Sequence, residues 1–229
     1  MSAKNTRERI VEAAAALLTE GGREAVSTRA VSAAAGVQAP TIYRIFGDKQ
    51  GLLDAVAEHG FATYLVSKAS SPPGEDPVED LRRGWDLHVG FGLAHPAFYT
   101  LIYGEPRPGL ESPAAREAAL VLAAHVHRIA EAGRLRVSEE RAAHLIHAAG
   151  SGTTLSMIAI PPARRDMELS VIARESIIAT VTTDKPPPAP GNTLVSTAVA
   201  LRATLHAATA LTHPERALLS EWLDRITHQ

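Results

Sequence analysis

The stretch from Val26 to Leu53 constrains the fold more than any other part of this chain. It holds two short segments with apolar residues at helical spacing, and Gly36 separates them at a point where a positive φ is expected. Pro40 falls in the first turn of the second segment, where a missing N–H costs nothing, and Gly47 ends that segment. The pattern predicts two short helices joined by a tight turn, which is the layout of a helix-turn-helix.

The rest of the chain is also predicted to be helical, because alanine is abundant and β-branched runs are few. Helices are expected at about 6–20, where Gly21-Gly22 ends the helix, at about 28–35 after a Ser27 or Thr28 cap, at about 40–46, and at about 49–70 after an Asp48 cap. Further helices are expected at about 77–94, 96–103, 112–132, 138–160, 166–182, 193–211 and 214–227. Residues 184–192 are predicted to form a stiff, proline-rich surface linker. The predicted fold class is therefore all-α.

The composition of the chain excludes several classes of protein. The 229 residues contain no cysteine, which excludes a disulfide scaffold and a cysteine-ligated zinc site and is compatible with a reducing compartment. No secretory leader and no apolar run of membrane-spanning length is seen, so we expect a cytoplasmic protein. Residues 1–50 hold seven Lys and Arg against five Asp and Glu, a net +2, which leaves −4 for the remainder of a chain whose net charge is −2.

The second of the two short helices has a side suited to base recognition. If Ile42, Ile45 and Phe46 face inward, then Pro40, Thr41 and Arg44 lie on or near the opposite side, and Tyr43 lies on a flank. Gln suits adenine edges, Arg suits guanine or phosphate, and Thr or Pro can contact a thymine methyl group. These residue types, with Gln38 at the first turn, indicate a helix that enters the DNA major groove.

Other side chains nearby suit the phosphate backbone. Thr28 and Tyr43 carry hydroxyls that can bind phosphate oxygens, although Thr28 could instead be only a helix cap and Tyr43 only a packing residue. Lys49 falls in the first turn of the next helix, where the ammonium and the free N–H groups would hold a phosphate together. Arg29 is either a further contact or a solvated surface charge.

The segment from about Thr6 to Leu65 resembles the N-terminal domain of the TetR (tetracycline repressor) family of bacterial regulators. The similarity rests on a set of motifs with ungapped spacing from Gly36 onward: Arg9-Ile10 through Ala14, Ser27-Thr28-Arg29, Ala35-Gly36-Val37, Thr41-Ile42-Tyr43-Arg44-Ile45-Phe46, Lys49 and Leu52-Leu53. The resemblance implies an all-helical homodimer that binds a palindromic DNA operator and releases it when a small-molecule inducer binds the C-terminal domain. It implies DNA contacts at Thr28, Gln38, Thr41, Tyr43, Arg44 and Lys49.

Two features follow from this resemblance. Ala39-Pro40 stands where the family often has a polar residue followed by a small residue or Gly, so base recognition at position 39 is expected to be apolar or absent. The domains are expected to be a helix-turn-helix domain over 1–50 and a ligand-binding and dimerisation domain over 51–229, with the helix at 49–70 connecting them.

The C-terminal part offers candidates for an inducer pocket, which would be largely apolar. Half of the ten aromatic residues fall between positions 85 and 103. The candidates are Trp85, His88, Phe91, Phe98, Tyr99 and Tyr103, with polar contacts from His125, His144 and His147. The aromatic residues could equally be ordinary core residues. Glu140, His144 and His147 share a helix face, but this spacing is a weak metal pattern, and we expect no metal and no other cofactor.

Within the run of small residues from Ala148 to Gly152, the two glycines and Ser151 lower helix propensity, which close helix packing would offset. The resemblance places such a late helix in the dimer interface, with 193–211 or 214–227 as its partner; intramolecular packing and space for a ligand are alternatives. We find no nucleotide-binding, esterase or metalloprotease motif, so an enzyme is not expected. A DNA-binding regulator without an inducer is the remaining alternative.

Overall fold

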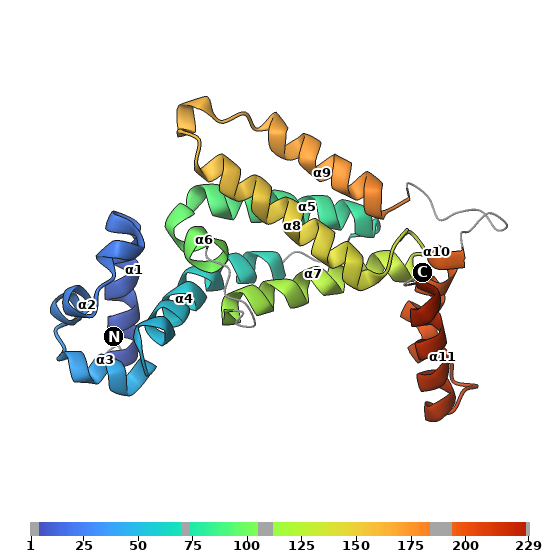
Figure 1. Ribbon diagram of the computed structural model, residues 1–229, viewed down its shortest axis with the longest axis horizontal. Helices are drawn as coiled ribbons and strands as arrows, with labels where there is room; N and C mark the ends of the chain where they lie inside the picture. The colour runs from blue at the N-terminus through green and yellow to red at the C-terminus, as the bar shows by residue number, and fades with distance from the viewer. Residues whose placement is uncertain (1–4, 70–73, 105–111, 184–193, 228–229) are drawn as a thin grey trace. The chain divides into compact units, whose positions relative to one another are not determined.

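The computed structural model describes residues 5–69, 74–104, 112–183 and 194–227, with the side chains of 63–69 left out; its helices are drawn in Figure 1. They are α1 (Thr6–Ala25), α2 (Thr28–Ala35), α3 (Ala39–Phe46), α4 (Lys49–Ala69), α5 (Pro77–Ala94), α6 (Pro96–Tyr103), α7 (Pro113–Glu131), α8 (Glu139–Ile158), α9 (Glu168–Val181), α10 (Leu194–Thr204) and α11 (His213–Thr227). Two short 3-10 turns, Pro162–Arg164 and Leu205–Ala207, accompany them. The all-α prediction is confirmed.

Two predicted helix ends were wrong. The first helix does not end at Gly21-Gly22 but continues to Ala25. It is kinked at Gly22, which takes φ 66° and ψ −167°, and the residues after the kink are helical again. The helix predicted over 193–211 ends at Thr204 and tightens into a 3-10 turn. The predicted linker 184–192 lies outside the described residues.

Capping side chains fix the starts of the first helices. Asn5 accepts a bond from the Glu8 N–H while Glu8 reaches back to the Asn5 N–H, which is a complete capping box that the sequence prediction missed. Ser27, rather than Thr28, caps α2 by accepting from the Ala30 N–H at 3.1 Å. Asp48 Oδ1 accepts from the Gly51 N–H at 2.7 Å, as predicted.

The described residues form two compact units. The N-terminal unit comprises the described parts of Met1–Ser71, Gly90–Ala118 and Met157–Ala159, and the C-terminal unit comprises those of Pro72–Val89, Ala119–Ser156 and Ile160–Gln229. In the N-terminal unit α1 packs on α2, α4 and α6, and α3 packs on α4. One apolar cluster joins these helices: Ile10, Val11, Ala14, Ala15, Leu18, Val26, Val31, Ile42, Leu52, Leu53, Ala55 and Val56.

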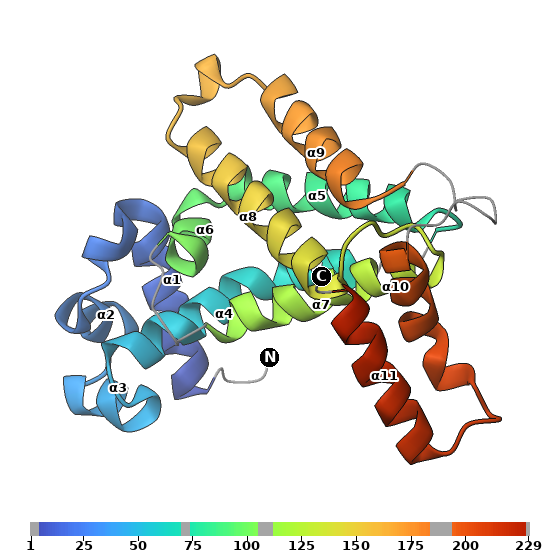
Figure 2. The same ribbon diagram turned by 45° about the vertical axis from the view of Figure 1, so that its right-hand side comes forward.

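In the C-terminal unit, the part of α5 before Gly90 lies beside α8 and α9, which both views show (Figures 1 and 2). The Trp85 indole N–H donates to Ser170 Oγ of α9 at 3.0 Å, and both residues are buried. Arg82 of α5 forms a forked ion pair with Glu175 of α9, with its closest contact at 2.9 Å. These contacts turn the charged side of α9 toward α5.

A buried ion-pair cluster fixes the start of α5 in the same unit. Asp80 is 3% exposed and pairs with Arg83 and with Arg128 of α7, while Arg128 also donates to the Gly74 carbonyl at 2.9 Å. Burial alone would raise the pKa of Asp80, but the bonds from Arg128 and the Gly74 N–H outweigh it and hold that pKa below its ordinary value. The cluster therefore stabilises the folded unit only while Asp80 is ionised.

Within the described ranges, every helix falls short of the length and apolarity that crossing a bilayer requires.

Candidate DNA-binding face

The helix α3 is held by a single fully buried side chain at its centre. Ile42 is 1% exposed and belongs to the apolar cluster of the N-terminal unit, and Ile45 and Phe46 pack against that cluster in partly buried positions. The inward face predicted for this helix is therefore observed. Anchoring through Ile42 leaves the opposite face of α3 free to meet another molecule.

The predicted contact residues are accessible to different degrees. Gln38, Pro40, Arg44, Arg29 and Lys49 are exposed. Tyr43 is 50% exposed, whereas Thr28, Ala39 and Thr41 are half-buried. All nine lie on α2, on α3 and the residue before it, or at the first residue of α4, and all belong to the N-terminal unit.

The turn between α2 and α3 has the backbone that the sequence predicts. Gly36 takes φ 63° and ψ 42°, the left-handed conformation that a Cβ disfavours, and the Val37 N–H bonds to the Ser32 carbonyl at 3.0 Å. At the other end of α3, a Cβ on Gly51 would lie 2.1 Å from the Phe46 carbonyl oxygen. Glycine at both positions thus lets α2, α3 and α4 meet closely.

Two of the predicted phosphate-binding hydroxyls are brought together. The Thr28 and Tyr43 hydroxyl oxygens lie 3.4 Å apart, so α2 and α3 present them as one pair. Lys49 is the first residue of α4 and directly follows Asp48, whose side chain accepts from the Gly51 N–H at that helix start. The arrangement can hold phosphate oxygens on both sides of α3.

Charge distinguishes this face from the other side of the same unit. The segments α2 and α3 contain Arg29 and Arg44 and no acidic residue. Between α1 and α4, in contrast, lies a cleft of about 270 Å³ that carries three carboxylates, on Glu8, Glu12 and Glu58. The negative charges of the cleft would repel phosphate. The surface of α2 and α3, which carries no carboxylate, therefore suits a polyanion better than the cleft does.

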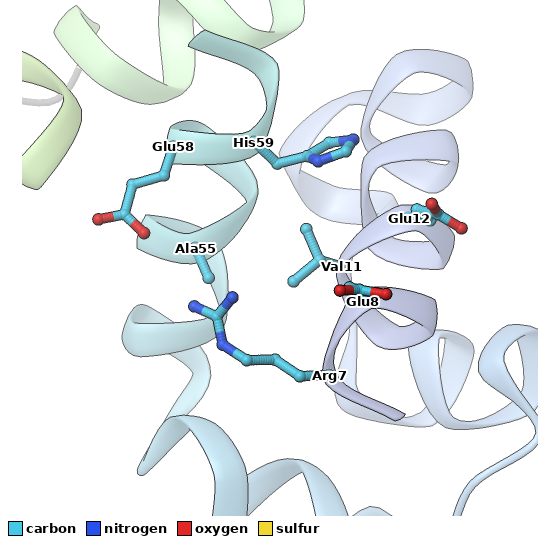
Figure 3. Close-up of a pocket in the computed structure, with 7 residues that line it drawn as sticks. All are labelled: Arg7, Glu8, Val11, Glu12, Ala55, Glu58 and His59. Atoms are coloured by element: carbon cyan, nitrogen blue, oxygen red, sulfur yellow. The ribbon is translucent and has the colours of Figure 1, made fainter. Parts of the chain in front are cut away.

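Figure 3 shows this cleft, with Arg7 extending from α1 toward α4 and His59 reaching from α4 toward α1. The Arg7 guanidinium lies over the Phe46 ring, 5.6 Å from its centroid. Arg7 therefore packs against Phe46, the last residue of α3, and helps to hold the end of that helix in place. The sequence analysis did not predict this contact.

The nine candidate ligand residues are divided between the two units. In the N-terminal unit Phe91 packs edge-on against Phe61 of α4 at 5.4 Å, and Tyr99 packs against Phe91 and Tyr103, at 6.5 Å and 4.8 Å. Tyr99 is fully buried. Phe98 lies against Gly60 of α4 and against the apolar cluster. These four candidates, Phe91, Phe98, Tyr99 and Tyr103, thus contribute to packing among α4, α5 and α6.

The other five candidates lie in the C-terminal unit. Trp85 and His88 pack against Gly150 of α8, where an added Cβ would lie 3.5 Å from the Trp85 ring and 3.7 Å from the His88 ring. His125 is half-buried on α7, and His144 and His147 are exposed on α8. Among the described residues, no three His, Asp or Glu side chains gather as metal ligands would.

Comparison with known proteins agrees with the geometry of the DNA-binding face. Residues 10–56 match the family described as bacterial regulatory proteins, tetR family. The chain is 39% identical over 79 residues to the HTH-type transcriptional repressor KstR of Rhodococcus jostii, which is 34% of this chain and 37% of that protein. It is 37% identical over 73 residues to the tetracycline repressor protein class C of Escherichia coli, 32% of each chain. These alignments span about a third of the length of both curated relatives.

Similarity of fold extends further than similarity of sequence. The crystal structure of a TetR variant from Acinetobacter baumannii AYE in complex with minocycline is 20% identical, with a TM-score of 0.60 over 77% of this chain and 96% of that one. The helix-turn-helix segment of this chain, residues 10–56, is therefore that of the TetR family of bacterial regulatory proteins, and the likeness of fold to solved structures extends over the helical C-terminal part.

Proposed function

We propose that this protein is a ligand-responsive transcriptional repressor that binds a palindromic operator as a homodimer. One observation carries the proposal: α3 presents Gln38, Pro40, Tyr43 and Arg44 around a single buried anchor, on a side of the unit where α2 and α3 carry no carboxylate. A polyanionic duplex is the partner that this combination of shape and charge suits.

Base recognition is assigned to three residues. Arg44 can form a forked bond with guanine, Gln38 can pair with adenine, and Thr41 can contact a thymine methyl group. Ala39 and Pro40 add only apolar contacts. Binding to phosphates is assigned to Lys49, to the hydroxyl pair of Thr28 and Tyr43, and to Arg29, and these contacts would set the position of α3 without reading sequence.

Dimerisation is assigned to late helices of the C-terminal unit, with α10 or α11 as the partner of α8. Exposed apolar side chains lie on α8, on α9 and at the turn before α9 (Leu145, Met167, Leu169, Val171 and Ile172, which we call the α8–α9 face), and on α10 and α11 (Leu194, Leu201, Leu218 and Trp222). Because Arg174 and Glu175 pair with Asp86 and Arg82 of α5, the outer side of α9 carries little charge. Gly152 of α8 has open space around its Cα, which would allow a second copy to approach closely.

Release of DNA is assigned to a small, largely apolar inducer. The Acinetobacter relative is described in complex with minocycline, and we extend a small-molecule response to this chain. In the C-terminal unit the candidate contacts are Trp85 and His88, which pack against Gly150 of α8, with His125, His144 and His147 as the polar candidates. Phe91, Phe98, Tyr99 and Tyr103 are separate candidates within the N-terminal unit. Ligand binding would act by moving the two α3 helices away from the separation of about 34–36 Å that adjacent major grooves require.

The test is selection of DNA fragments by the purified full-length chain, followed by sequencing and by binding assays with a small-molecule panel. The proposal predicts one palindromic sequence, affinity that falls steeply with salt, and loss of binding with at least one compound. Binding to all fragments alike would refute a sequence-specific regulator. A selected palindrome that no compound releases would instead indicate the regulator without an inducer.

A further inference from the structure

The helix α1 is kinked shortly before its end, and two neighbouring glycines make the kink possible. Gly22 takes φ 66° and ψ −167°, a backbone conformation that essentially only glycine adopts. A Cβ on Gly21 would lie 2.7 Å from the Ala25 Cβ, so the chain is closely packed on that side of the kink. A Cβ on Gly22 would instead meet nothing within 4 Å. The kink therefore leaves open space beside Gly22.

A cleft of about 280 Å³ lies at this open side, between the end of α1 and α6, which pack on each other within the N-terminal unit. Figure 2 shows the end of α1 beside α6. The cleft, which we call the α1–α6 cleft, is lined by Gly22, Arg23, Pro96, Ala97, Thr100 and Leu101. None of the nine candidate inducer contacts is among these six described residues.

The residues that line the α1–α6 cleft suit a small molecule with one negative charge and an apolar body. Arg23 is half-buried and is the one charged residue among the six, and the eight residues of α6 are all uncharged. The planar guanidinium of an arginine can bind both oxygens of a carboxylate. The Thr100 hydroxyl can donate a further hydrogen bond, and Pro96, Ala97 and Leu101 supply apolar surface.

Charge separates the α1–α6 cleft from the cleft between α1 and α4 in the same unit. The cleft between α1 and α4 carries three carboxylates, which would repel an anion. The six residues that line the α1–α6 cleft include an arginine and no carboxylate. Glu20 and Glu24, which lie close to Arg23 along the chain, are exposed and do not belong to the lining. An anion is therefore the better match for the α1–α6 cleft.

We propose that the α1–α6 cleft binds a small aliphatic carboxylate. Ala97 and Leu101 are one helical turn apart, about 6 Å along α6, which matches an extended chain of about five carbons. A volume of about 280 Å³ lies at the small end of the range for ligand pockets, which favours a ligand of this size over a larger one. This site goes beyond the proposed function, because it requires neither DNA nor the inducer.

Methyl NMR of the full-length protein, with hexanoate as the probe, tests the proposal at the site itself. Ala97, Thr100 and Leu101 carry methyl groups, and Ala97→Ser and Thr100→Ser variants identify the first two signals. Hexanoate should shift all three sets of signals until the site is saturated. Hexanamide has the same chain but no charge, so it should bind about tenfold more weakly or worse, because the charged contact with Arg23 is lost.

Three further variants separate the role of Arg23 from general effects of charge. Arg23→Gln should weaken hexanoate binding about tenfold or more. Thr100→Phe should abolish it, because the larger side chain would occupy the cleft, and Thr100 is exposed, so the apolar cluster is not disturbed. Arg136→Gln is the matched control, since Arg136 is an exposed arginine of the C-terminal unit, and its Kd for hexanoate should equal that of the unmodified chain. Circular dichroism should show the same helix content in all variants.

The outcomes are distinct from those that test the proposed function. Shifts that are specific for hexanoate, lost in Arg23→Gln and kept in Arg136→Gln would support the carboxylate site. Signals of Ala97, Thr100 and Leu101 that do not move at millimolar hexanoate would overturn it. Equal shifts with hexanamide, or an unchanged Kd in Arg23→Gln, would overturn it as well. A failure of the chain to select a palindromic operator would refute the proposed function and leave this result unchanged.

Discussion

Gly60 of α4 gives the sharpest energetic prediction, because the aromatic ring of Phe98 occupies the place where a side chain would go. A Cβ on Gly60 would lie 2.1 Å from Phe98 Cδ1, 2.4 Å from Cε1 and 2.7 Å from Cγ. Ordinary contacts between such atoms are about 3.5–4.0 Å, so the ring must move by roughly 1 Å or more. Phe98 also packs against the apolar cluster under the DNA-binding face, which limits where the ring can go.

The expected cost of Gly60→Ala is the difference between two effects. Overpacking a filled site costs typically about 1–3 kcal/mol, and we take about 2 kcal/mol here. Replacing Gly by Ala inside a helix gains about 1 kcal/mol. The free energy of unfolding should therefore fall by about 1 kcal/mol. In a Phe98→Ala background the ring is gone, so the same substitution should raise that free energy by about 1 kcal/mol.

Urea unfolding followed by circular dichroism measures all four proteins of this double-mutant cycle, with an expected coupling of about 2 kcal/mol between the two sites. Gly90→Ala is the matched control, because Gly90 is also helical and a Cβ there would meet nothing within 4 Å. That variant should gain about 1 kcal/mol in either background. If Gly60→Ala has the same effect with and without the Phe98 ring, the packing argument is wrong.

Three further predictions concern the turn, the hydroxyl pair and the buried ion pairs. Gly36→Ala should lower the free energy of unfolding by about 1–2 kcal/mol, because a Cβ is disfavoured at φ 63°; an unchanged urea midpoint would contradict this. Tyr43→Phe should leave stability unchanged and weaken operator binding a few-fold in an anisotropy assay, since a half-exposed ring loses only its hydroxyl; equal affinity would remove Tyr43 from the phosphate contacts. Because the pKa of Asp80 is lowered in the folded protein, its contribution is complete at neutral pH and is lost as pH falls through the folded value. Asp80→Asn should therefore cost about 2 kcal/mol at neutral pH and less in acid, and a cost independent of pH would refute the assignment.

Local signals predicted most of the fold. Proline at the first turn of α3 and α6, the Ser27 and Asp48 caps and the glycine turn at Gly36 each act within a few residues, so the sequence alone locates them. The inward face of α3 also follows from periodicity, because Ile42 has few alternatives once the helix is assigned. The main features of the DNA-binding face therefore follow from short-range sequence patterns.

Contacts between distant segments could not be predicted in this way. Periodicity places Trp85 and Phe91 on one helix, but Trp85 bonds to Ser170 while Phe91 packs against Phe61. Asp80 and Arg128 are 48 residues apart, and nothing in either local sequence marks them as partners. Spacing along a helix gives a face and not the identity of its neighbour, which is why the sequence alone does not define a ligand pocket.

In this protein α3 is assigned to reading the base sequence and the start of α4 to holding phosphate, and one binding measurement separates these two roles. The full-length chain, Arg44→Ala and Lys49→Ala are each titrated with the selected operator and with an unrelated duplex across a range of salt concentrations. We predict that Arg44→Ala loses discrimination between the two duplexes, worth about 1–3 kcal/mol, while Lys49→Ala weakens binding to both and lowers the salt slope by about 1. Unchanged discrimination with Arg44→Ala, together with an unchanged salt slope with Lys49→Ala, would contradict the assignment.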